Sequence, residues 1–124
     1  MTDYVTLAEA LTIHDDQIKR YGGSPGVRDL GLLEAALSRP QTAYYSDLIE
    51  EAAALWESLS QNHPFIDGNK RTAFAVTYTF LAINGRRITA DAMAAYAFIA
   101  GLYGSGDFNF PTLVPWLRAN VGRI

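Results

Sequence analysis

The sequence predicts a single all-α domain over residues 1–124, folded as a compact bundle of six helices. Three observations support this fold class. Apolar residues recur at helical spacing along most of the chain, the stretches between these segments are short, and strand patterns are weak. With 124 residues, 49% of them hydrophobic and 19% charged, the chain is also long and apolar enough to form one core of its own.

The first three helices are predicted from apolar residues spaced three or four positions apart. The three stripes are Leu7, Leu11, His14 and Ile18, then Leu30, Leu33 and Leu37, then Leu48, Ala52, Leu55 and Leu59. The glycines and proline of "YGGSPG", residues 21–26, end the first helix, and Pro40 closes the second. The segment "QTAYYSD", residues 41–47, predicts at most a short extended flap. Asp47 and Glu50 then form the acidic capping box expected at the start of the third helix.

The fourth helix is predicted over residues 69–83, where apolar side chains cover nearly every face. A helix of this kind is typical of the buried centre of a bundle, so we expect it to form the core. Gly85 is its expected C-cap, and Arg86 and Arg87 are expected to be a solvated helix end.

The fifth and sixth helices are predicted on either side of a glycine-rich stretch. Thr89 is the expected cap of the fifth helix. Its apolar stripe is Ala92, Tyr96 and Ile99. The stretch "GLYGSGDFNFP", residues 101–111, is expected to be a loop. The sixth helix should then begin near Thr112, because Pro115 is tolerated only in a first turn.

Charge and composition exclude several classes of function. The formal net charge is −3, which argues against broad, direct binding of nucleic acid or of an anionic membrane. The chain has no cysteine, so a disulfide framework and a thiolate metal site are both excluded. We see no signal peptide and no apolar run long enough to span a membrane, so a cytoplasmic location is the default expectation.

The densest chemistry lies in "HPFIDGNKRTAF", residues 63–74, where a loop is predicted to become the fourth helix. The first turn of a helix has unpaired N–H groups and a partial positive charge, which together favour a bound phosphate. Gly68 lets the backbone approach a ligand closely, with Asn69 beside it. Lys70 and Arg71 add two cations to an end that is already positive. A bound anion would resolve that conflict, so we interpret this segment as a functional site.

His63 and Asp67, which precede the fourth helix, add an acid–base group and a candidate metal ligand. The imidazole of His63 can accept a proton near neutral pH. Asp67 offers one hard carboxylate ligand, and one carboxylate plus nucleotide phosphates is a usual way to hold Mg²⁺. A base, a metal ligand, an anion site and two cations together favour transfer of a phosphate-containing group.

Structural roles compete with these functional ones. His63 could cap the third helix, and Asp67 could cap the fourth. Lys70 and Arg71 could belong to a solvated face. For His14, which lies on the apolar stripe of the first helix, the preferred interpretation is a partly buried histidine with a hydrogen-bond partner.

The same stretch resembles the signature of the Fic/Doc family, His-x-Phe-x-Asp/Glu-Gly-Asn-x-Arg. The wider sequence is more similar to the Doc branch, the toxins of toxin–antitoxin pairs. The similar segments are "IHDDQIKRYGGSPGVRDLGLLEAALSRPQ", residues 13–41, and the shorter "FLAINGRRI" and "WLRAN". The resemblance therefore extends over nearly the whole chain and implies a Fic/Doc-type bundle with a central helix after the motif loop.

The resemblance also implies roles for individual residues. His63 would be the general base that takes a proton from a target hydroxyl, and Asp67 would bind Mg²⁺. The phosphates of ATP would be held by Gly68, Asn69, Lys70 and Arg71.

Departures from the general Fic pattern bear on the reaction. Lys70 stands where nucleotidyl-transferring members have Gly, and Phe74 stands where they have a second Arg. Both belong to the Doc branch, whose implied activity is a protein kinase that transfers the γ-phosphate of ATP to a threonine of elongation factor Tu and arrests translation. Gly68 and Pro64 are Fic-like choices, which keep nucleotidyl transfer (AMPylation) to a protein hydroxyl as an alternative.

A toxin of this kind implies a Phd-type antitoxin as partner. We expect the disordered C-terminal segment of the antitoxin to fold as a helix into a hydrophobic groove near the first helix and the motif loop. A second alternative follows, in which the chain acts mainly as an antitoxin-binding corepressor module rather than as an enzyme.

Overall fold

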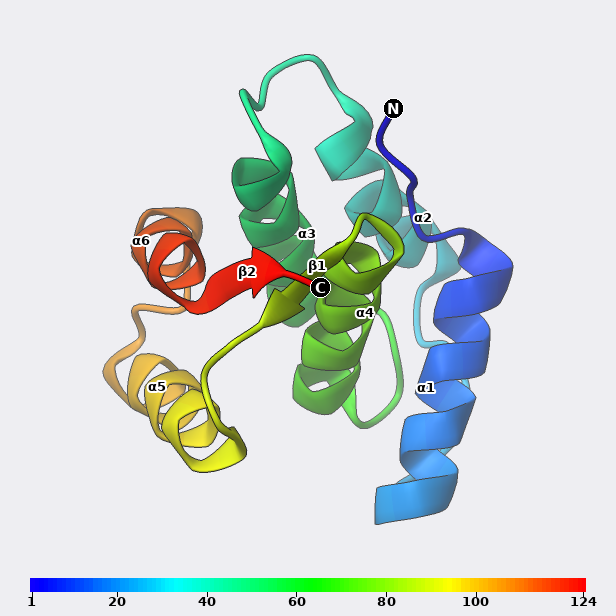
Figure 1. Cartoon of the computed structure of the whole chain (residues 1–124). Helices are drawn as coiled ribbons and strands as arrows, with labels where there is room; N and C mark the ends of the chain where they lie inside the picture. Colours follow the sequence, from blue (N-terminus) through cyan, green and yellow to red (C-terminus); the bar gives the residue numbers. More distant parts are fainter.

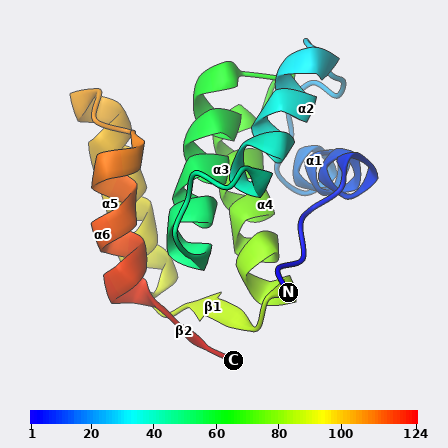
Figure 2. The same cartoon turned by 90° about the horizontal axis from the view of Figure 1, so that it is seen from above.

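A computed structural model describes all residues, 1–124, and confirms the six predicted helices. Two helices, α3 (Leu48–Asn62) and α4 (Asn69–Ile83), lie side by side in the middle of the molecule (Figure 1). One flank is covered by α1 (Leu7–Tyr21) and α2 (Leu30–Ser38), the latter followed by the short 3₁₀ helix η1 (Arg39–Gln41). The other flank is covered by α5 (Ala92–Ser105) and α6 (Phe110–Asn120), as the view from above also shows (Figure 2).

The core is built around the contact between α3 and α4. Helix α3 buries nine of its residues, among them Trp56, whose ring contacts Phe74, Phe108 and Trp116. Burying a large aromatic side chain excludes more water than burying any aliphatic one, so Trp56 joins α3, α4 and α6 in one core. None of the six helices combines the length and apolarity needed to cross a bilayer.

The start of α3 agrees only in part with the predicted capping box. Asp47 accepts a hydrogen bond from the backbone N–H of Glu50 at 2.9 Å, as expected for an N-cap. The carboxylate of Glu50, however, accepts from Ser46 rather than from Asp47. Before α3, residues 41–47 form no strand. They lie at the opposite end of α3 from the motif loop, about 22 Å away along a 15-residue helix.

The predicted boundaries of α5 are wrong at both ends. Asp91, not Thr89, is its N-cap, because the Asp91 carboxylate accepts from the N–H of Ala94 at 2.8 Å. The helix continues through Ser105, so the first part of the predicted loop 101–111 is helical. Gly101 and Gly104 do not break it, since glycine lowers helix stability without blocking the helical hydrogen bond.

Helix α6 begins two residues earlier than predicted. Asn109 caps it by accepting from the N–H of Thr112, so Thr112 lies inside the first turn. Pro115 consequently falls in the second turn, within the helix, rather than in its first turn. Its missing N–H removes one backbone hydrogen bond, a loss that the packing of the flanking Leu113 and Leu117 offsets, both of which are fully buried.

Two short strands were not predicted. The strands β1 (Arg86–Ile88) and β2 (Val121–Arg123) pair antiparallel, with Arg86 opposite Arg123. The expectation that Arg86 and Arg87 form a solvated helix end is therefore wrong, although α4 does end with Gly85 in the left-handed conformation, at φ +76°, just after its C-cap Asn84. A three-residue strand pairing with the C-terminus leaves no periodic pattern in the sequence.

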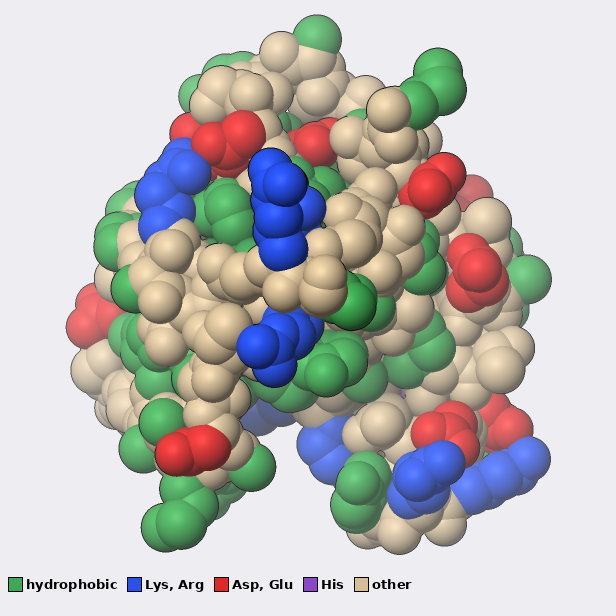
Figure 3. Space-filling view, in the orientation of Figure 1, with side chains coloured by type: hydrophobic (Ala, Val, Ile, Leu, Met, Phe, Trp, Pro, Cys, Tyr) green, Lys and Arg blue, Asp and Glu red, His purple; other side chains and the backbone are tan.

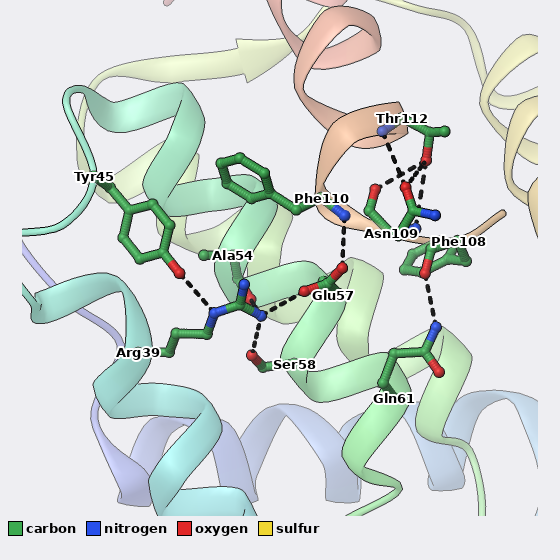
Figure 4. Close-up of polar contacts among 10 residues, drawn as sticks. All are labelled: Arg39, Tyr45, Ala54, Glu57, Ser58, Gln61, Phe108, Asn109, Phe110 and Thr112. Atoms are coloured by element: carbon green, nitrogen blue, oxygen red, sulfur yellow. Dashed lines mark hydrogen bonds and ion pairs between the residues drawn. The ribbon is translucent and has the colours of Figure 1, made fainter.

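A polar network ties η1 and α3 to the start of α6 (Figure 4). The guanidinium of Arg39 donates to Tyr45 at 2.7 Å, to Glu57 at 2.6 Å and to Ser58 at 2.8 Å. The other oxygen of Glu57 accepts from the backbone N–H of Phe110 at 2.6 Å, at the N-terminal end of α6. A carboxylate there also complements the helix dipole, so Glu57 orients α6 against α3.

We expect Arg39→Met to lower the free energy of unfolding by about 1–2 kcal/mol, because it leaves the largely buried Glu57 carboxylate without its cation. Arg20→Met is the matched control. Arg20 pairs with Asp16 on the exposed face of α1, and its loss should cost much less, because solvent screens an exposed ion pair. Urea unfolding measures both changes; equal losses would contradict the role given to the network.

Candidate active site

The motif loop, residues 63–68, begins where α3 ends. His63 is the one non-glycine residue with positive φ, at φ 47° and ψ 55°, and this left-handed conformation turns the chain out of the helix. Pro64 and Phe65 are buried behind it and carry the loop on the core. The side-chain amide of Asn69 then closes the loop, accepting from the N–H and donating to the C=O of Phe65, both at 2.9 Å.

The turn between α1 and α2 holds this loop from the outside. Val27 and Phe65 form an isolated antiparallel bridge, and the N–H of Ile66 donates to the C=O of Gly26 at 3.1 Å. Arg28 adds a side-chain clamp. Its guanidinium donates to the last carbonyls of α3, at 2.8 Å to Asn62 and 2.7 Å to His63, which fixes the backbone from which the His63 imidazole projects.

His14 supports the loop from α1, and its preferred interpretation as a buried, hydrogen-bonded histidine is confirmed. The imidazole is 4% exposed and stacks on the ring of Phe65, with centroids 3.9 Å apart. Its Nε2–H donates to the backbone C=O of Asp67 at 2.8 Å. His14 therefore acts on the site through the loop rather than by contact with a ligand.

The carboxylate of Asp67 is exposed and oriented by two backbone donors. The N–H of Ser24 lies 3.1 Å from one oxygen and the N–H of Gly68 lies 2.8 Å from the other. These bonds to the charged form lower the pKa of Asp67 below its usual value, with smaller contributions from the cationic Arg71 and from His14. Gly23 makes the approach possible, because a Cβ atom there would lie 2.8 Å from a carboxylate oxygen of Asp67.

Helix α4 starts without a side-chain cap. Its N-cap is Gly68, at φ 73°, and the first intrahelical donor is the N–H of Thr72, which bonds to the C=O of Gly68. The N–H groups of Asn69, Lys70 and Arg71 have no protein acceptor. The alternative in which Asp67 caps α4 is therefore wrong, because its carboxylate takes the N–H of Gly68 and none from the first turn.

The side chains of Lys70 and Arg71 extend in different directions from the first turn of α4. The Arg71 guanidinium donates to the C=O of Gly22 at 2.8 Å and lies over the ring of Tyr21. The Lys70 ammonium lies 4.4 Å from the ring centroid of Tyr103 on α5. Both side chains therefore remain at the helix start, although neither has a carboxylate partner.

All six predicted site residues line one polar hollow of about 410 Å³. They are His63, Asp67, Gly68, Asn69, Lys70 and Arg71, joined by Ile66. Asn69 uses its side-chain oxygen and one amide N–H on the loop, which leaves its second amide N–H and its backbone N–H free to donate to a ligand. Gly23, Ser24 and Arg28 were missed. The clustering of three glycines in "YGGSPG", all of which adopt positive φ, was the available signal, but sequence alone interprets that segment as a turn.

The donors around the hollow fit Mg²⁺ only in company with phosphate. No group of three or more His, Cys, Asp or Glu side chains is close enough to hold a metal ion by itself. Asp67 contributes one carboxylate, and each of its oxygens accepts one hydrogen bond and so keeps a free lone pair. This is the donor set expected for a cation held jointly by one carboxylate and by nucleotide phosphates.

A larger and mostly apolar groove of about 1190 Å³ adjoins the hollow and separates α1 from α5, with α4 as its floor. It is visible as the indentation at the lower edge of the space-filling view (Figure 3). Phe74 and Tyr78 of α4 line it, which explains why that helix is apolar on faces that the core does not cover. Lys70 and Arg71 line both the groove and the polar hollow.

Comparison with known proteins gives a consistent result. Residues 4–81 match the model of the Fic/DOC family. The chain is 48% identical over 96 residues to the protein named Toxin Doc of Mycolicibacterium smegmatis, a match that covers 73% of this chain and 72% of the relative. It is 38% identical over 89 residues to Protein kinase doc of Escherichia phage P1, covering 68% of this chain and 71% of that relative.

We expect Gly23→Ala to raise the pKa of Asp67, because the new methyl group would push the carboxylate away from its donors. A lowered pKa means that Asp67 contributes stability above its unfolded pKa of about 4, and that this contribution disappears as the pH falls through the folded value. The variant should lose less stability over that acid range. Carbon-13 NMR titration of the Asp67 carboxyl measures the shift.

The control is Gly22→Ala. Gly22 also has positive φ, at 85°, but a Cβ there has no neighbour within 4 Å. It should therefore carry the backbone strain of an alanine in this conformation without moving the Asp67 titration. Equal titrations in both variants would refute the assignment of Gly23 as the residue that admits the carboxylate.

Proposed function

Because this chain belongs to the Fic/DOC family, we propose that it is the toxin of a toxin–antitoxin pair and acts as a protein kinase. The proposed reaction moves the γ-phosphate of ATP to a threonine hydroxyl of elongation factor Tu, which arrests translation in the cytoplasm. The observation that supports it most is the uncapped start of α4, where free N–H groups and two cations border the same hollow as His63. The relative named as a protein kinase supports the choice of reaction.

The proposed chemistry uses residues of the hollow in distinct roles. The His63 imidazole accepts the proton of the target hydroxyl as its oxygen bonds to the γ-phosphorus, and the bond from that phosphorus to the β,γ-bridging oxygen breaks to release ADP. The N–H groups of the first turn of α4, with Lys70 and Arg71, stabilise the charge on the phosphates. Asp67 would hold Mg²⁺, which neutralises phosphate charge when bound.

Nucleotidyl transfer uses the same hollow with ATP in the opposite orientation, and Gly68 is compatible with it. Lys70 favours the kinase, because a cation beside the anion site suits the more highly charged end of the triphosphate. Phe74 favours it too, since its ring packs against Trp56 at 5.6 Å between centroids and offers no phosphate donor.

We expect purified protein, incubated with elongation factor Tu and ATP labelled at the α or the γ position, to transfer label from the γ position only. Transfer from the α position alone would refute the kinase and leave nucleotidyl transfer. No label from either position would support the corepressor module.

The matched variant is His63→Asn. Asparagine tolerates the left-handed backbone of residue 63 better than alanine, so the loop should keep its shape while the base is lost. We expect transfer to fall by about 10²- to 10⁴-fold with little change in melting temperature. Full activity in this variant would remove His63 from the chemistry.

We further propose that the C-terminal segment of a Phd-type antitoxin binds in the groove between α1 and α5. The groove is mostly apolar, and of the fourteen residues of α5 only Ala95 is buried, so the helix leaves part of its apolar surface exposed along the groove. Tyr96 is 74% exposed there. An amphipathic helix would cover these side chains and would lie against Lys70 and Arg71.

Tyr96→Glu should weaken binding of a synthetic C-terminal peptide of the antitoxin by about tenfold or more, because it puts a charge in an apolar contact. Met93→Glu is the control, since Met93 lies on the same helix, is 84% exposed and does not line the groove. Fluorescence anisotropy with labelled peptide compares the two. Equal weakening would place the peptide elsewhere.

A further inference from the structure

Lys70 is held at the polar hollow by an aromatic ring rather than by a carboxylate. Its ammonium lies over Tyr103, 4.4 Å from the ring centroid, and makes no salt bridge or hydrogen bond within the chain. Lys70 nevertheless lines the hollow in this conformation. A cation over the face of an aromatic ring is attracted by the negative potential of that face, so the ring fixes a side chain that would otherwise extend into solvent.

The ring of Tyr103 is itself fixed on two sides. It stacks on the buried Phe108, with centroids 4.4 Å apart and planes inclined by 5°. Its hydroxyl shares a hydrogen bond with the buried Ser60 of α3. A ring anchored to α3 and to the start of α6 cannot move with the flexible lysine, so the lysine takes its position from the ring.

We propose that Tyr103 is a positioning residue, whose ring holds the Lys70 ammonium at the rim of the hollow where it meets a nucleotide phosphate. The proposal rests on the proposed function for its ligand. It also explains how one cation is positioned when the other is fixed differently, since Arg71 already donates to the C=O of Gly22. A lysine side chain has a flexible four-carbon stem, so anchoring the ammonium removes freedom that ligand binding would otherwise have to remove.

The first test needs no nucleotide. Protons held over an aromatic face resonate upfield, so the ε-methylene protons of Lys70 should be shifted upfield in the full-length protein. Lys19 is the only other lysine and pairs with Asp15 on exposed α1, so it supplies an internal reference. The shift should persist in Tyr103→Phe, which keeps the ring, and disappear in Tyr103→Leu. Coincident Lys70 and Lys19 signals in the unmodified protein would overturn the proposal.

The second test is a double-mutant cycle on binding of a non-hydrolysable ATP analogue with Mg²⁺, measured by calorimetry. Tyr103→Leu should weaken binding by about two- to fivefold, and Tyr103→Phe should restore it. In a Lys70→Met background, Tyr103→Leu should have no further effect, because the cation that the ring holds is gone. An equal loss with methionine at position 70 would mean that the ring acts on folding alone, and would overturn the proposal.

The two tests separate the proposal from the function on which it rests. If the ε-methylene protons of Lys70 show the expected upfield shift but the protein binds no nucleotide, the contact with Tyr103 stands and the proposed function is refuted. Nucleotide binding that is insensitive to Tyr103→Leu, in a protein that transfers γ-phosphate, would refute the role of Tyr103 and leave the kinase standing.

Discussion

The motif loop keeps one conformation because its polar backbone groups are bonded to neighbours that come from distant parts of the chain. In the turn before α2, the C=O of Gly26 accepts from the N–H of Ile66, and the N–H of Arg28 donates to the C=O of Pro64. From the start of α4, the side-chain amide of Asn69 bonds to both backbone polar groups of Phe65. A buried or half-buried backbone group without a partner costs free energy, so each of these bonds excludes alternative loop shapes. The positions of His63 and Asp67 follow from this constraint.

Much of the fold, and the gathering of the six candidate site residues around one hollow, could be predicted because the signals are local. A helix is recognised from apolar residues that recur three or four positions apart, and most of the six helices were predicted from this short-range pattern. The proposal of an anion site rests on Lys70 and Arg71, because two cations at a positive helix end favour a bound anion, and the structure shows both at the start of α4 without a carboxylate partner. The motif is continuous in sequence, so its members lie together in space by chain connectivity alone.

What could not be predicted depends on contacts between distant segments. The strands β1 and β2 exist only because the C-terminus returns to Arg86, and three residues carry no strand pattern. Helix α5 keeps its glycines because tertiary packing outweighs propensity. Arg28 and Gly23 support the site from a segment whose composition indicates only a turn, and their roles follow from where that turn is placed against the motif loop. Tyr103 reaches Lys70 across more than thirty residues of sequence.

Lys70 and Arg71 belong to the walls of two cavities at once. An occupant of either cavity therefore alters the field and the side-chain freedom that an occupant of the other meets. Thermodynamic linkage makes this effect mutual. If a ligand in one cavity changes the affinity of a ligand in the other by some factor, the second ligand changes the affinity of the first by the same factor. If an anion occupies the hollow as proposed, affinities measured for the apolar groove will depend on the anions in the buffer, and the choice of chloride or phosphate becomes part of defining the binding constant.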